Sequence, residues 1–89
     1  MTAREFVEAL AAFCMIERAS VTSYFRTPAH NQALHGVLHS PHCYWRGADV
    51  VYDFSGPRGE RQETARRLGL TLIQEGDHDH LQPATWEPG

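Results

Sequence analysis

Histidine and acidic residues gather in two short clusters of this chain, and the separation between the clusters limits how the chain can fold. Five of the six histidines lie either in HGVLHSPHCYWRGAD (residues 35–49) or in GDHDH (residues 76–80), and none lies between these segments. Histidine is the commonest metal ligand in proteins. A fold that binds one ion with both clusters must bring the two segments side by side.

The composition is that of one globular domain, residues 1–89, with 42% hydrophobic residues, 21% charged residues and a formal net charge of −3. A chain of this size buries only about 60–65% of its unfolded surface on folding, so we expect modest stability. All eight basic residues are arginines scattered along the chain. This distribution argues against nucleic acid as a partner, because domains that bind it carry a basic patch.

No segment suggests membrane insertion or export. No run approaches the roughly 18 apolar residues that span a bilayer, and the N-terminus lacks the basic and apolar parts of a signal peptide. We therefore expect the chain to be cytoplasmic when it is synthesised. Its two cysteines, Cys14 and Cys43, are too few for a disulfide scaffold, and we predict that both are free thiols.

Residue patterns predict helices and strands in alternation. Thr2 and Glu5 form a capping box before a run of apolar residues at helical spacing. Pro28 and Gly36 suit the first residue and the C-terminal stop of a short helix. The expected elements are a helix within 2–20, a strand at 20–25, a short helix at 27–36, a strand at 48–54, a helix at 60–69 and strands at 70–74 and 78–82. This order predicts a compact α+β domain.

His42 and Asp49 can bind one metal ion only if the chain turns between them. A straight strand would separate them by roughly 23 Å, whereas the glycine of YWRGA allows the chain to fold back. His80 would supply a third ligand from a neighbouring strand. Two histidines and one carboxylate leave a tetrahedral position open for water, as in catalytic zinc sites, and Asp77 could take the proton of that water. The plainer alternative is that the histidines are solvated and that Asp49 caps a turn.

Two stretches of the chain resemble a family of zinc peptidases: VTSYFRTPAHNQALHGVLHSPHCYWRGADVVYD and ARRLGLTLIQEGDHDHLQ. The family includes bacterial D-alanyl-D-alanine carboxypeptidases and phage L-alanyl-D-glutamate endolysins, and it shares its fold with the hedgehog signalling domain. Its pattern is Ser-Gly-Tyr-Arg, then Asn, Gly and Ser-x-His, an Asp after six further residues, and finally Asp or Glu separated by two residues from His. The matching residues here are Ser23, Arg26, Asn31, Gly36, Ser40, His42, Asp49, Asp77 and His80.

The resemblance implies a hedgehog-like fold in which helices flank an antiparallel sheet. It implies a zinc site formed by His42, Asp49 and His80, with Asp77 as the general base. Arg26 would hold a substrate carboxylate or the developing oxyanion. Ser40 and Asn31 would orient a ligand or the substrate.

The chain departs from the family pattern beside the expected site. Tyr24 and Phe25 stand where the family has Gly and Tyr, which removes one hydroxyl near Arg26. Trp45 stands where Gly is common after the first ligand. These differences leave the choice of substrate more open than the binding of metal.

The last motif can be matched in two ways. Glu75 and His78 have the same spacing as Asp77 and His80. We favour the second pair because HLQP fits the outgoing strand of the family better. Zinc content after substitution of each histidine by alanine would distinguish the two.

These features predict a zinc-dependent peptidoglycan peptidase, either an endolysin-like endopeptidase or a D,D-carboxypeptidase, that hydrolyses an amide bond in the stem peptide. The expected place of action is the bacterial cell wall, with a phage or a bacterium as the source. One alternative is a catalytically inactive zinc-bound interaction module, since small domains gain stability from a structural ion. Another is a metal-free inhibitor protein, which metal analysis of the purified chain would exclude.

Overall fold

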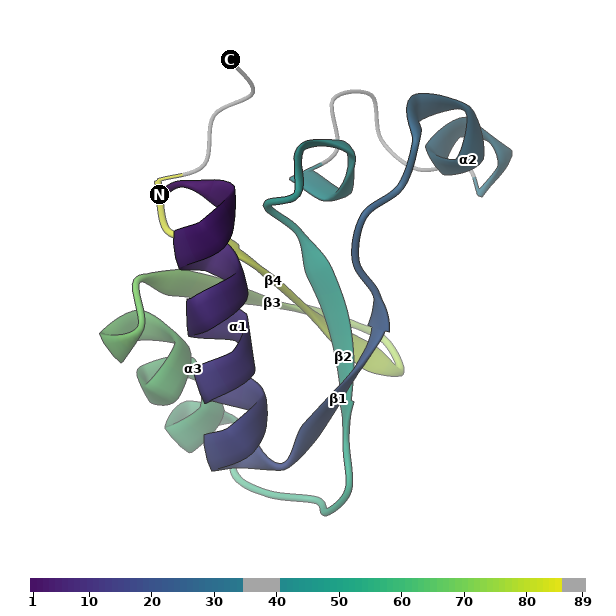
Figure 1. The fold of residues 1–89 in the computed structure, drawn as a ribbon. Helices are drawn as coiled ribbons and strands as arrows, with labels where there is room; N and C mark the ends of the chain where they lie inside the picture. The colour runs from purple at the N-terminus through teal and green to yellow at the C-terminus, as the bar shows by residue number, and fades with distance from the viewer. Residues whose placement is uncertain (35–40, 86–89) are drawn as a thin grey trace.

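The computed structural model describes residues 1–34 and 41–85, which contain both helices and β-strands. The elements are α1 (Ala3–Glu17), β1 (Ala19–Ser23), α2 (Pro28–Ala33), the 3₁₀-helix η1 (Pro41–Tyr44), β2 (Ala48–Tyr52), α3 (Arg58–Arg67), β3 (Leu70–Glu75) and β4 (His78–Pro83). The four strands form one antiparallel sheet in the order β1-β2-β4-β3. The predicted α+β class and antiparallel sheet are confirmed (Figure 1).

The first helix begins at the predicted capping box. The Thr2 hydroxyl accepts the Glu5 N–H at 3.1 Å, and the Glu5 carboxylate accepts the Thr2 N–H at 2.7 Å. Both bonds satisfy backbone donors that have no partner inside the helix. Helix α1 then buries one stripe, formed by Phe6, Leu10 and Phe13.

Helices α1 and α3 cover the same face of the sheet, with α1 crossing in front of the strands and α3 beside it (Figure 1). The core between these layers consists of Phe6, Leu10, Phe13, Ala48, Val50, Ala65, Leu70, Leu72 and Leu81. Phe6 and Phe13 have no exposed surface, and each contributes roughly 1.5–3 kcal/mol of burial energy. The helix-covered face of the sheet therefore contains the hydrophobic core.

Strand alternation places polar residues on the other face. Ala48 and Val50 point into the core, so Asp49 between them points away from it. In β4, Leu81 is in the core and His80 faces the opposite side. Asp49 and His80 are direct partners across the β2–β4 pair, which puts their side chains next to each other.

Helix α2 and η1 lie together at one end of the sheet (Figure 1). Helix α2 begins as predicted at Pro28, where the Thr27 hydroxyl accepts the His30 N–H at 3.2 Å. After η1 the chain turns sharply, and a Cβ on Gly47 would lie 2.8 Å from the His42 backbone nitrogen. Gly47 therefore allows the predicted fold-back between the two candidate ligands.

The hairpin between β3 and β4 is tighter than the sequence suggested. The expected strands, 70–74 and 78–82, left residues 75–77 for the turn, but β3 continues through Glu75, which pairs with His78. The turn consists of Gly76, at φ +73°, and Asp77. Glu75 therefore belongs to a strand, and only Asp77 projects from the turn.

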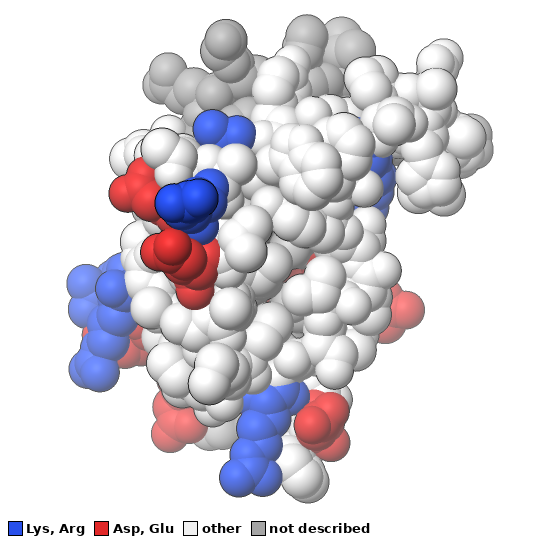
Figure 2. Space-filling view, viewed as in Figure 1, with Lys and Arg blue, Asp and Glu red and all other residues white. Residues whose placement is uncertain are grey.

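The face seen in Figure 2 carries charges of both signs. Figure 2 shows acidic and basic side chains interspersed on the face in view, with no basic patch among the described residues there. Within residues 1–34 and 41–85, no helix combines the length and apolar character that crossing a bilayer requires. Cys14 and Cys43 are free thiols, as predicted.

Candidate metal centre

Three side chains from separate elements meet on the face of the sheet away from α1 and α3. They are His42 from η1, Asp49 from β2 and His80 from β4, with 3%, 7% and 5% of their surfaces exposed. Because buried charged groups are normally paired or bind a metal, this cluster needs a chemical explanation.

The three potential ligand atoms form a nearly equilateral triangle. His42 Nε2 lies 3.2 Å from Asp49 Oδ1, His80 Nδ1 lies 3.1 Å from the same oxygen, and the two nitrogens are 3.3 Å apart. A tetrahedral zinc ion with bonds of about 2.0–2.1 Å holds its ligand atoms about 3.3–3.4 Å apart. The triangle therefore has the size of one face of a tetrahedral zinc site.

The second nitrogen of each imidazole determines what the first can do. His42 Nδ1 lies 2.6 Å from the Tyr24 backbone oxygen, and His80 Nε2 lies 2.8 Å from Gln82 Oε1. Both oxygens accept hydrogen bonds, so these nitrogens carry protons and donate. In neutral imidazoles, His42 Nε2 and His80 Nδ1 then carry no proton and each offers a lone pair. Two lone pairs and a carboxylate oxygen converge, and only a positive charge, a proton or a metal ion, stabilises that arrangement.

The charge of Asp49 is favoured by its surroundings. Burial by itself raises the pKa of this carboxyl group, but hydrogen bonds from His42 and then from His80, which the imidazoles donate when a proton rather than a metal ion occupies the site, outweigh burial and hold the pKa below its usual range. A ligand carboxylate must be ionised to bind metal. Asp49 is thus already in the form that a metal requires.

Arg26 is fixed beside the cluster by three side chains. Its Nη2 donates to Asp49 Oδ2 at 3.2 Å, its Nη1 to Asn31 Oδ1 at 3.2 Å and its Nε to Ser23 Oγ at 3.3 Å. Asn31, only 5% exposed, therefore orients Arg26. Arg26 lies at the site as expected, and its guanidinium also anchors Asp49.

Asp77 does not join the cluster. Its side chain is 97% exposed because it lies in the two-residue turn, and its Oδ1 contacts His78 Nδ1 at 2.9 Å. This contact raises the pKa of His78 and lowers that of Asp77. The expected position of Asp77 beside the ligands is therefore corrected.

Glu75 is the carboxylate that approaches the ligands from the hairpin. Its Oε1 lies 3.8 Å from His80 Nδ1, and His78 Nε2 lies 3.8 Å from Asp49 Oδ2. Glu75, His78 and Asp49 form a second group of potential ligand atoms, within 4.8 Å of one another. The sequence offered two pairs, Asp77 with His80 and Glu75 with His78. The structure brings His80 of the first pair close to Glu75 of the second.

Two contributors to the site were missed in the sequence. Gln82 lies two positions after His80 on the same face of β4, so strand alternation could have identified it. The other is the Tyr24 backbone carbonyl, for which a sequence contains no signal. Ser40, predicted to orient a ligand or the substrate, lies outside the described residues, as does Gly36.

Comparison with protein families, with curated proteins and with solved structures gave no match to this chain.

Proposed function

We propose that this chain is a zinc-dependent peptidase that hydrolyses an amide bond in the stem peptide of peptidoglycan. The observation that supports the proposal best is the meeting of two imidazole lone pairs and one carboxylate oxygen within 3.3 Å of one another. The reaction and the substrate class come from the sequence resemblance to zinc carboxypeptidases and endolysins.

Zinc suits these ligands in chemistry and in size. His42, Asp49 and His80 would hold the ion, and two imidazoles with one carboxylate are typical of catalytic zinc, which keeps one position open. When bound, the ion would polarise the scissile carbonyl and lower the pKa of water at the site. The Tyr24 carbonyl and Gln82 keep the imidazoles in the required tautomers.

Two carboxylates are candidates for the general base. The sequence pattern favours Asp77, whereas Glu75 has its carboxylate 3.8 Å from a ligand nitrogen. A base must come within hydrogen-bond reach of the proton it removes. Because Asp77 is turned to solvent and bound to His78, we propose Glu75 for this role. Asp77 would then only orient the His78 ring.

Arg26 is the proposed anchor for an anionic part of the substrate. Ser23, Asn31 and Asp49 hold its guanidinium in place, and two of its five N–H donors are not needed for these bonds. A guanidinium binds carboxylates with two parallel bonds. Stem peptides carry free carboxylates, so Arg26 would position the peptide next to the metal.

The test is hydrolysis of purified, dye-labelled cell walls together with the zinc content of each variant. We expect Glu75→Gln to keep zinc and lose about 10²- to 10⁴-fold in rate, the usual contribution of a general base. Asp77→Asn, the matched control, should retain most activity. The reverse ranking would return the base role to Asp77. A zinc-loaded wild type that releases no dye from any cell wall would refute the peptidase proposal.

The second candidate function is a zinc-bound interaction module without catalysis. It is supported by the burial of all three ligands, each at most 7% exposed, because a closed site is typical of structural zinc. On this alternative, His80→Ala unfolds the domain and no variant changes any rate of hydrolysis. If the chain is a peptidase, Glu75→Gln should lose hydrolytic activity while it remains folded and keeps zinc.

The proposed place of action follows from the proposed substrate. Peptidoglycan lies outside the cytoplasmic membrane, so the chain would act outside that membrane. Fractionation of producing cells before and after lysis, with detection of the chain, tests this part of the proposal.

A further inference from the structure

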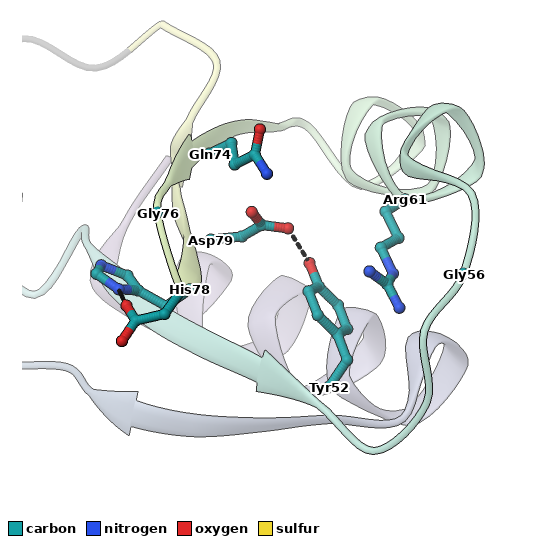
Figure 3. A pocket seen from close by; sticks show the side chains of 8 residues that line it. Tyr52, Gly56, Arg61, Gln74, Gly76, His78 and Asp79 are labelled. Carbon is teal, nitrogen blue, oxygen red and sulfur yellow. Dashed lines mark hydrogen bonds and ion pairs between the residues drawn. The ribbon is translucent and has the colours of Figure 1, made fainter.

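A polar cavity lies on the helix side of the sheet and is separate from the metal centre. It has a volume of about 310 Å³ and is lined mainly by Tyr52, Arg61, Gln74, Asp77, His78 and Asp79 (Figure 3). Asp79 precedes His80 in β4 and therefore points to the opposite face of the sheet. The volume is at the lower end of the range of small-molecule sites.

Asp79 is an unusual residue to find in this wall. It is only 8% exposed, yet its one hydrogen bond among the described residues comes from the Tyr52 hydroxyl, at 2.6 Å to Oδ2. No arginine or histidine within the described ranges lies within ion-pair distance of it. Buried aspartates are rarely unpaired. Burial and the bond to Asp79 raise the pKa of Tyr52, so the hydroxyl keeps its proton and remains a donor.

Arg61 supplies the opposite charge on another wall. Its guanidinium lies 3.5 Å from the centroid of the Tyr52 ring, and Nη2 donates to the Phe54 backbone oxygen at 2.6 Å. These contacts fix the group from two sides. Arg61 forms no ion pair with a carboxylate in the described part of the chain. Its remaining N–H donors are therefore available to a ligand.

The view in Figure 3 shows how these groups are arranged. Asp79 and Gln74 extend from neighbouring strands on one side, Arg61 extends from α3 on the other, and Tyr52 rises between them. A ligand that satisfies both walls must donate to the carboxylate and accept from the guanidinium. The amide of Gln74 can donate to or accept from the same ligand.

We propose that this cavity binds a small zwitterion of the free amino acid class, with its ammonium group on Asp79 and its carboxylate on Arg61. The site does not depend on the proposed peptidase function. Asp79 and Arg61 lie on the helix side of the sheet, and none of the three candidate metal ligands lines the cavity. His78, which also lines it, approaches Asp49 on the other face at 3.8 Å.

Binding is measured by titrating glycine and alanine into the isotopically labelled, metal-free chain and following amide NMR signals around the cavity. A chelator and the His42→Ala variant keep any metal-bound amino acid from contributing. We expect saturable shifts at Gln74, Gly76 and Arg61 with millimolar affinity. N-acetylalanine and alaninamide, which each lack one charge, should bind at least about tenfold more weakly.

Variants test the contributions of Asp79 and Arg61 to binding separately. Asp79→Asn and Arg61→Gln should each weaken alanine binding by at least about tenfold, while Arg66→Gln, on the exposed side of α3, should have no effect. An unchanged amide spectrum outside the cavity verifies that each variant is folded. The proposal is overturned if alanine causes no saturable shift up to roughly 10 mM, if the blocked analogues bind equally well, or if both wall variants bind like the wild type.

Discussion

Replacing Asp49 by asparagine tests the centre of the candidate metal site directly. The Asp49 side chain is 10% exposed, with Oδ1 within 3.2 Å of both imidazoles and Oδ2 bonded to Arg26 at 3.2 Å. The substitution keeps the shape of the side chain and removes its charge. Arg26 is then left 16% exposed without its ion-pair partner.

The size of the effect follows from the burial of this pair. Removing one partner of a buried ion pair costs about 3–5 kcal/mol, and we use about 3 kcal/mol because asparagine retains an oxygen that can accept from Arg26. In a domain of 60–100 residues, 1 kcal/mol shifts the unfolding midpoint by about 4–8 °C. The metal-free variant should therefore unfold about 12–24 °C below the metal-free wild type.

The assay is thermal and urea unfolding followed by circular dichroism, with and without zinc. Zinc at a thousandfold excess over its Kd should stabilise the wild type by about 4 kcal/mol and Asp49→Asn much less. Asp53→Asn, at an exposed position, controls for loss of a charge alone. A change below about 1 kcal/mol in the metal-free variant, combined with undiminished stabilisation by zinc, would refute the reasoning.

Four further substitutions test other parts of the structure. Tyr52→Phe removes the hydroxyl that donates to buried Asp79 at 2.6 Å, so it should cost about 1.5–3 kcal/mol in urea unfolding and leave zinc content unchanged. Gly47→Ala places a Cβ 2.8 Å from a backbone nitrogen and should lower both stability and zinc affinity, whereas Gly59→Ala, with no atom within 4 Å, should gain about 0.5–1 kcal/mol from helix propensity. Asp77→Asn should reduce metal-free stability only in a window of pH. Contact with Asp77 raises the pKa of His78, so its contribution to stability is complete below the ordinary pKa of 6.5 and is lost as the pH rises through the folded value. The same contact lowers the pKa of Asp77, so that contribution is complete above the ordinary pKa of 3.8 and is lost as the pH falls through the folded value. Urea midpoints from pH 4 to 8 that differ equally at every pH would contradict this assignment.

Strand alternation explains why much of the site was predictable. The sequence ADVVYD places Asp49 between two core residues, and HDHLQ places His80 opposite to buried Leu81. Both residues then face the same side once the strands pair. The turn that returns His42 to Asp49 was also predictable, because it requires a glycine at a close approach of two backbone segments.

The sequence could not predict which carboxylate approaches the candidate ligands, because this depends on whether β3 ends at Gln74 or at Glu75. If the turn contained Glu75, both acidic residues of the hairpin would face solvent alike. With Glu75 in β3, the same residue lies on the metal-centre face and Asp77 alone is turned outward. Sequence patterns locate strand ends only to within a few residues. Spacing alone therefore could not distinguish the two acids.

Strand β4 serves both faces of the sheet with consecutive residues. Its odd-numbered positions, Asp79 and Leu81, belong to the cavity and the core, and its even-numbered positions, His80 and Gln82, belong to the candidate metal centre. Loss or gain of one residue here would exchange the two sets and put an imidazole among the leucines. During evolution this hairpin can therefore change by substitution but not in length, and insertions must accumulate in other connections.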